Sequence, residues 1–200
     1  MSNAFSDISF AQKLKVETSA MHQELENLPI SNAIVKEEVT KEDYLRYLHL
    51  MHDVIKDIET SIFPLLYAEV DDLPKRIKTP LIEQDFASLG YTKPQYPPLF
   101  KSLNMQTSTA FAMGVLYVIE GSTLGGRVIY KHIHKLLGID SNSGAAYFAG
   151  YGEETGLFWK NFITTLVAYE KNHNTSEKII EGANYTFQAI KTHFERGIEL

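Results

Sequence analysis

The sequence predicts an all-α protein, a single multi-helix bundle that takes in residues 1–200. Three observations favour this fold class. Apolar residues recur every three or four positions along most of the chain, which is the period of a helix that buries one face. No segment of useful length alternates apolar and polar residues, as a half-buried β-strand would. Hydrophobic residues make up 44% of the chain and no segment is dominated by Ser, Pro or Gly, so we expect one compact domain with a sizeable core.

The first half of the chain predicts three helices. Apolar side chains at helical spacing predict a first helix over about residues 7–27, namely Ile8, Phe10, Leu14, Met21, Leu25 and, just after it, Leu28. Thr40 and Asp43 have the spacing of a capping box, which predicts that a second helix begins there and continues towards Leu66. Residues 73–89 predict a third helix, which we expect to be broken near Pro80 because proline lacks a backbone N–H.

The second half predicts a loop and three further helices. Residues 91–100 contain three prolines, which fix the backbone in an extended path and therefore indicate a loop. The fourth helix is expected over residues 107–137, first apolar on nearly all sides and then amphipathic. The last two helices are expected over residues 153–171 and 176–200.

Composition and charge exclude several kinds of function. The formal net charge of -6 argues against nucleic acid as a main partner, because phosphate binding relies on clustered Lys and Arg. The chain has no cysteine, so any bound metal must be held by His or by carboxylates. Residues 1–10 lack the pattern of a signal peptide, and the longest apolar run, residues 110–119, is too short to span a bilayer. We therefore expect a cytoplasmic protein that does not cross a membrane.

Three glycines interrupt the fourth predicted helix, at Gly121, Gly125 and Gly126. Each glycine inside a helix costs about 1 kcal/mol relative to alanine, so three within six residues indicate that something needs the space. Close packing of another helix, or a kink, would use that space. A flat, apolar cofactor that lies on the helix would use it equally well. We expect Gly126 to lie on another side of the helix from Gly121 and Gly125.

The first helix carries a polar stripe beside its apolar face. Lys15, Ser19, His22 and Glu26 follow one another at spacings of four, three and four residues, which places them on one side of the helix. A neutral imidazole can bind iron through one ring nitrogen, while a carboxylate one turn away accepts the other N–H. The same His and Glu spacing also occurs in ordinary surface pairs, so the stripe alone leaves both interpretations open.

Several segments of the chain also resemble a known protein family. Residues 117–129, YVIEGSTLGGRVI, resemble the distal-helix signature of haem oxygenases, especially the bacterial branch that includes the bacteriophytochrome-associated enzymes. Residues 14–26 are similar to that family's proximal helix, and residues 148–162 resemble the bacterial pattern that follows the distal helix. Phe187 and Phe194 are similar to aromatic positions that line the family's haem pocket. The resemblance covers nearly the whole chain.

The resemblance implies a haem oxygenase-like bundle with a glycine-kinked distal helix, and it implies a role for each candidate residue. His22 stands at the position of the axial ligand to the haem iron, with Glu26 beside it. Gly121, Ser122 and Gly125 stand at the catalytic positions of the distal helix. Many family members have an Asp where this chain has Ser122, so the group that organises the distal water is left open. Ser122, the preceding Glu120, the following Arg127 and backbone carbonyls are the candidates.

The remaining implied contacts concern the edge of the cofactor. Lys15 matches a position that contacts a haem propionate, and Lys160 is a second candidate for the same role. Either lysine could instead be an ordinary solvated residue. Phe187 and Phe194 would line the pocket.

The implied activity is that of a haem-degrading oxidoreductase. Haem would be both substrate and cofactor, and the enzyme would use O2 and electrons from an external reductant, a ferredoxin-like protein or another reductase. The implied products are biliverdin, carbon monoxide and ferrous iron. Two alternatives are a non-catalytic haem-binding or iron-handling protein on the same fold and a non-haem enzyme of that fold, because fold alone does not determine function.

Overall fold

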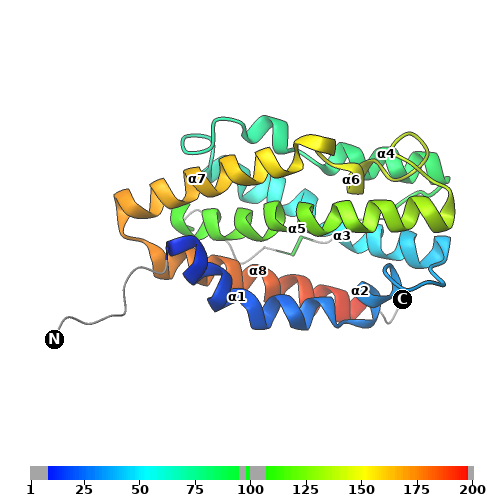
Figure 1. Ribbon diagram of the computed structural model, residues 1–200, viewed down its shortest axis with the longest axis horizontal. Helices are drawn as coiled ribbons and strands as arrows, with labels where there is room; N and C mark the ends of the chain where they lie inside the picture. The colour runs from blue at the N-terminus through cyan, green and yellow to red at the C-terminus, as the bar shows by residue number, and fades with distance from the viewer. Residues whose placement is uncertain (1–8, 95–97, 100–106, 198–200) are drawn as a thin grey trace.

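The computed structural model describes residues 9–94, 98–99 and 107–197, whose arrangement is shown in Figure 1. The α-helices are α1 (Phe10–Glu26), α2 (Pro29–Ala33), α3 (Lys41–Ser61), α4 (Thr79–Leu89), α5 (Thr109–Leu137), α6 (Ala146–Ala149), α7 (Thr155–His173) and α8 (Ser176–Arg196). Three short 3-10 turns are η1 (Phe63–Leu65), η2 (Leu73–Arg76) and η3 (Gly152–Glu154). These residues contain no β-strand, which confirms the predicted all-α fold class.

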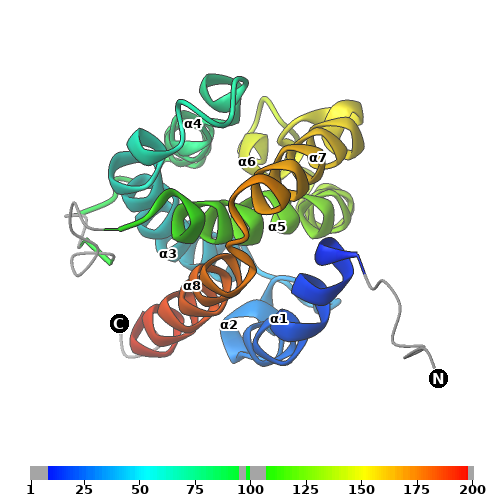
Figure 2. The same ribbon diagram turned by 90° about the vertical axis from the view of Figure 1, so that its left-hand side faces the viewer.

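The long helix α5 lies at the centre of the molecule. It packs against α6, α7 and α8, and Figures 1 and 2 show α7 on one side of it with α1 and α8 together on the other. Residues 110–116 are all buried, which agrees with the expectation that the first half of this helix is apolar on nearly all sides. The helix is assigned without interruption through its three later glycines, and the kink stays a prediction.

Local capping groups explain where several helices begin and end. The capping box between Thr40 and Asp43 is confirmed, with both backbone N–H groups bonded to the reciprocal side chain at 3.0 and 3.1 Å. Ser108 accepts a hydrogen bond from the N–H of Phe111 at the start of α5. Gly138 ends that helix at φ +69°, a left-handed conformation that glycine adopts at little cost.

Prolines lie at two boundaries of the predicted helices, one of which differs from the prediction. The second predicted helix ends at Ser61 rather than Leu66, and Pro64 lies in the short turn η1 that follows. The expected break near Pro80 is confirmed, because residues 73–89 divide at Ile77 and Lys78. Pro80 itself lies in the first turn of α4, where a backbone N–H would have no partner within the helix. The segment before it forms the separate turn η2.

Two short helices, α2 and α6, were not predicted, since five and four residues are too few to show a helical period. Helix α6 depends on a distant carboxylate. Asp85 of α4 is buried and accepts the N–H groups of Ala146 and Tyr147 at 2.6 and 2.9 Å. Burial raises the pKa of Asp85 from 3.8 to about 6, against the opposing effect of these two hydrogen bonds. Residues 7–8 and 198–200 of the predicted helices, and residues 95–97 and 100 of the predicted loop, lie outside the described residues.

The raised pKa of Asp85 predicts a pH-dependent contribution to stability. Because the carboxyl binds its proton more tightly in the folded protein, the contribution is fully present below pH 3.8 and is lost as the pH rises through about 6. The shift corresponds to at most about 3 kcal/mol. Denaturant unfolding of the parent and of Asp85→Asn across this range should therefore show the parent losing stability relative to the variant. Parallel pH profiles would contradict the assignment.

Candidate functional site

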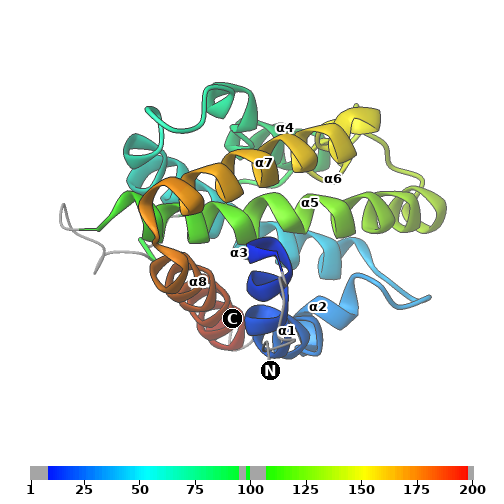
Figure 3. The ribbon, with the colours of Figure 1, turned by 60° about the vertical axis from the view of Figure 1, so that its left-hand side comes forward.

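A cavity of about 780 Å³ opens beside the second half of α5. Helices α1 and α2 lie along the same side of α5 in Figure 3, with α8 next to α1, and the cavity takes side chains from all four. Its lining also includes residues of α3, α6 and α7 together with Lys78. Most of the lining is apolar, with a few polar groups, as in a site for a small organic ligand or cofactor.

The polar stripe of α1 faces this cavity. Lys15, Ser19, His22 and Glu26 all line it. The Nδ1 atom of His22 lies 3.4 Å from a carboxylate oxygen of Glu26, and both side chains are more than half exposed, at 55% and 65%. Phe187 of α8 holds the imidazole edge to face, with the ring centroids 5.7 Å apart. The Nε2 atom of His22 is thus left as the nitrogen that can bind a metal.

Of the predicted aromatic and basic site residues, all but Lys160 line the cavity. Phe187 and Phe194 both line the cavity and are buried. Lys15 lies on the exposed side of α1, where an ammonium could pair with an anionic group at the mouth. Lys160 is exposed on α7 and does not belong to the lining. The structure therefore favours Lys15 over Lys160 as a contact for a ligand in this cavity.

The three glycines of α5 all line the cavity, but their surroundings differ. A β-carbon added at Gly125 would meet no atom within 4 Å. At Gly121 it would lie 3.6 Å from the ring of Trp159, and at Gly126 it would lie 3.5 Å from Phe148. Gly126 is buried, as expected for another side of the helix, although it still contributes to the lining. Gly125 is therefore the position where the helix backbone is most open to a ligand.

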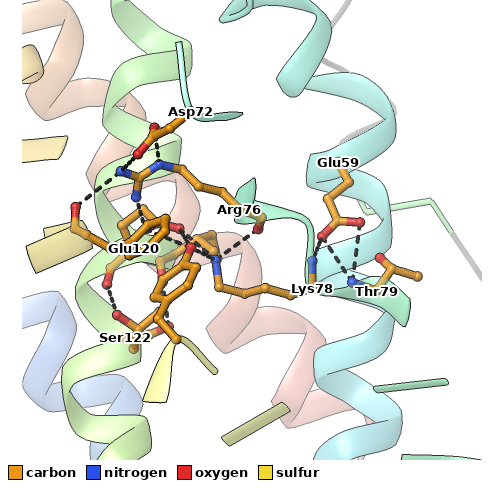
Figure 4. Close-up of polar contacts among 11 residues, drawn as sticks. Glu59, Asp72, Arg76, Lys78, Thr79, Glu120 and Ser122 are labelled. Carbon is orange, nitrogen blue, oxygen red and sulfur yellow. Dashed lines mark hydrogen bonds and ion pairs between the residues drawn. The ribbon is translucent and has the colours of Figure 1, made fainter. Parts of the chain in front are cut away.

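Of the side chains considered for organising a distal water, Ser122 alone lines the cavity. Its hydroxyl donates to the carbonyl of Ile119 at 2.8 Å, so its oxygen remains an acceptor. Glu120 is fully buried and bonds to other parts of the protein, as Figure 4 shows. Arg127 donates to the carbonyl of Ala149 at 3.3 Å and is not part of the lining.

Other residues of the cavity were not predicted as site residues, although Tyr117 and Trp159 lie within the segments 117–129 and 148–162 that carry the resemblance. Tyr117 and Trp159 pack against each other with ring centroids 5.6 Å apart, and both line the cavity. Burial raises the pKa of Tyr117, while a hydrogen bond with Thr18 of α1 acts in the opposite direction. Lys78 reaches the cavity from the segment before α4. Periodicity identifies such residues as core or surface, but it does not show which cavity they share.

Two features are absent from the part of the chain that the structure describes. No group of three or more His, Cys, Asp or Glu side chains among them could hold a metal ion. None of the helices in that part of the chain combines the length and apolar character that a membrane crossing requires.

The lining fits a haem group on three observations. The cavity is lined by an accessible imidazole on α1 and by a glycine on α5 whose added β-carbon would meet no protein atom within 4 Å. Buried aromatic rings complete an apolar interior, as a porphyrin requires. An exposed lysine stands at the edge, where a carboxylate group would be balanced.

Comparisons with known proteins point to one family. The family model described as Heme oxygenase matches residues 8–196. The chain is 27% identical over 187 residues to Heme oxygenase PigA of Pseudomonas aeruginosa, covering 93% of this chain and 91% of that protein. It is also similar to the heme oxygenase of Neisseria meningitidis, solved with NO and CO bound, with TM-score 0.80, 26% identity and coverage of 97% and 94%. Heme oxygenase-1 of Synechocystis, solved in complex with heme, shares the fold at TM-score 0.74 and 16% identity, with coverage of 94% and 92%.

Proposed function

Because the chain belongs to the haem oxygenase family and is therefore a haem-degrading oxidoreductase, we propose that it opens the haem ring to biliverdin, carbon monoxide and ferrous iron. Bound haem supplies the iron at which O2 is activated and is itself the molecule consumed. One observation carries the proposal: His22, Glu26 and the glycines of α5 line the same cavity, although about a hundred residues separate them in the chain.

Each group in the cavity has a role in this proposal. His22 would bind the iron through Nε2, and Glu26, whose carboxylate lies 3.4 Å from Nδ1, would accept a hydrogen bond from the Nδ1–H. That hydrogen bond would fix the tautomer and make the imidazole a better ligand. Gly121 and Gly125 keep the facing helix free of β-carbons, and Ser122 is the polar side chain nearest to them in sequence. Lys15 pairs with a propionate at the mouth. Phe187 and Phe194 exclude water from the interior.

The direct test is to add haemin and a reductant to the purified protein in air. We expect the Soret band to disappear while biliverdin and carbon monoxide form. A complex that binds haemin but keeps its Soret band unchanged would favour the alternative, a haem-binding or iron-handling protein. A protein that binds no haemin would favour a non-haem enzyme of the same fold.

Three finer assignments belong to the same proposal. The electron donor is an external reductant, such as a ferredoxin-like protein, because the chain has no cysteine to hold an iron–sulfur cluster of its own. The chain belongs to the bacterial branch that includes the bacteriophytochrome-associated enzymes, for which the support is residues 117–129. It acts in the cytoplasm, which agrees with its lack of cysteine.

The variant Gly125→Ala separates close approach of a ligand from ordinary helix packing. A β-carbon there meets no protein atom within 4 Å, so the apo protein should gain up to about 1 kcal/mol of stability from helix propensity. The same methyl group would occupy space beside the bound haem, and we expect haem turnover to fall by about tenfold, or about 1.4 kcal/mol of barrier. Thermal unfolding of the apo protein and the rate of biliverdin formation measure the two effects.

Gly156→Ala is the matched control for this variant. Gly156 lies in the first turn of α7, outside the cavity, and a β-carbon there also meets no atom within 4 Å. Its apo protein should be equally or more stable than the parent, and its turnover should be unchanged. If Gly125→Ala degraded haem at the parental rate, the close-approach explanation would be wrong.

A further inference from the structure

A buried charge cluster lies directly behind the α5 wall of the cavity, and the proposed chemistry does not use it. At its centre is Glu120, the residue before Gly121, whose side chain is fully buried. Its carboxylate accepts hydrogen bonds from the guanidinium of Arg76, from Lys78 Nζ at 2.6 Å and from the Tyr151 hydroxyl at 2.9 Å (Figure 4). Three segments distant in sequence, around residues 76–78, 120 and 151, therefore meet at one carboxylate.

Every charge in this cluster has a partner. The Lys78 ammonium uses its three N–H groups on Glu120, on the Tyr151 hydroxyl at 2.7 Å and on the Arg76 carbonyl at 3.1 Å. Arg76 makes a two-pronged contact with Asp72 at 2.7 and 2.8 Å. Two cations and two anions balance. Because Lys78 has no donor left for a ligand, the cluster is suited to fixing positions rather than to transferring protons.

The cluster holds three parts of the cavity wall at once. Lys78 itself lines the cavity, and the adjoining Thr79 N–H is anchored by Glu59 of α3 at 3.1 Å. The Tyr151 ring stacks on Phe158 at 4.1 Å and an interplanar angle of 3°. The next residue, Trp159, lines the cavity and faces Gly121. A movement at the cluster would therefore change the spacing between α5 and α7.

Protonation states support this geometry. Burial raises the pKa of Tyr151, and the neighbouring charge of Glu120 acts in the same direction. The phenol therefore keeps its proton and remains a hydrogen-bond donor to the carboxylate. Arg76 also lies over the rings of Phe158 and Phe162, at 5.2 and 5.7 Å, which fixes the first turns of α7 against the same cluster.

We infer that Glu120 is a positioning residue, which through Lys78, Arg76 and Tyr151 sets the spacing between Gly121 of α5 and Trp159 of α7. That spacing limits how closely a flat tetrapyrrole can approach the glycine segment. The inference rests on the proposed function for the identity of the ligand. The spacing itself is a property of the protein without haem, and can be measured there.

Trp159 provides the probe, since it is the single tryptophan of the chain. The test variant is Lys78→Met with Glu120→Gln, which removes one charge of each sign and keeps both side chains close to their original length. In the apo protein we expect acrylamide quenching of Trp159 to rise at least about twofold as the wall loosens, while circular dichroism stays helical. The affinity for haemin, measured from the quenching of Trp159 fluorescence by bound haemin, should fall about tenfold.

The matched control is Lys178→Met with Glu181→Gln, the same exchange in a surface ion pair of α8 with a 2.6 Å contact. It should behave as the parent in both measurements. The single variant Lys78→Arg keeps the cation, so its acrylamide quenching should stay close to that of the parent. If the double variant does not fold, Tyr151→Phe keeps the stacked ring, removes one hydrogen bond and should raise the quenching by less.

The inference is overturned if a folded double variant, or Tyr151→Phe in its place, shows the quenching of the parent. Failure of the proposed function is a separate result. A parent protein that binds haemin without degrading it would remove the enzymatic role and leave the comparison of Trp159 in the apo proteins unaffected.

Discussion

Replacing His22 with alanine is expected to abolish the normal haem spectrum and to lower haem turnover by at least about a hundredfold, or about 2.7 kcal/mol of barrier. The reason is that His22 is the candidate iron ligand in the cavity, with Glu26 beside Nδ1 and Phe187 against the ring. Haemin titration followed at the Soret band, together with biliverdin formation, measures the effect. The apo variant should remain folded, because the imidazole is 55% exposed and its loss leaves no buried cavity.

Two further variants complete this experiment. Glu26→Gln keeps His22 but weakens the acceptor at Nδ1, so we expect haem affinity or activity to fall by about tenfold to a hundredfold. His173→Ala removes an exposed histidine near the end of α7 that bonds to the Tyr169 carbonyl, and should change neither quantity. A parental Soret band in His22→Ala would show that another group binds the iron.

Replacing Gly182 with alanine should destabilise the protein by about 3 kcal/mol or more, because the new β-carbon would clash with the backbone of a neighbouring helix. At the crossing of α5 and α8 it would lie 2.1 Å from the backbone oxygen of Phe111. Gly114 of α5 is restricted in the same way, because a β-carbon there would lie 2.0 Å from the backbone oxygen of Ile179 in α8. Both obstacles are backbone atoms, so relief requires the two central helices to separate.

Chemical denaturation of the apo protein measures this loss, which corresponds to a fall in Tm of roughly 6–12 °C. Helix propensity alone predicts the opposite sign, a gain of up to about 1 kcal/mol for glycine to alanine. Gly156→Ala, where no atom lies within 4 Å, supplies that reference. If Gly182→Ala were as stable as Gly156→Ala, the close crossing of α5 and α8 would be wrong.

Much of the architecture could be predicted from local patterns. The all-α class and six of the helices followed from apolar residues at a period that is a property of each helix by itself. The capping box of Thr40 and Asp43 spans four residues, so the sequence alone contains both partners. The break near Pro80 was predicted, whereas the helix end before Pro64 was not, because proline can either break a helix or begin one.

The candidate site was predictable only in part. The stripe containing His22 and the glycines containing Gly125 each lie within one helix, so their spacing and their resemblance to a known family could be read along the chain. Lys160 has the same kind of family resemblance but lies outside the cavity lining. Whether a residue at a helix surface faces a cavity depends on the rotation of that helix in the bundle, which the sequence does not give.

The sequence by itself therefore determined the helices, their apolar faces and the pairing of a histidine with a carboxylate one turn away, because these depend on neighbours within a few positions. The tertiary structure decided what lies behind and between the helices. The partners of Glu120, at positions 76, 78 and 151, are tens of residues away, and buried charges show no periodic pattern. Gly114 and Gly182 likewise carry no mark of their role until two helices cross there, since close backbone contact is a property of the pair and not of either segment.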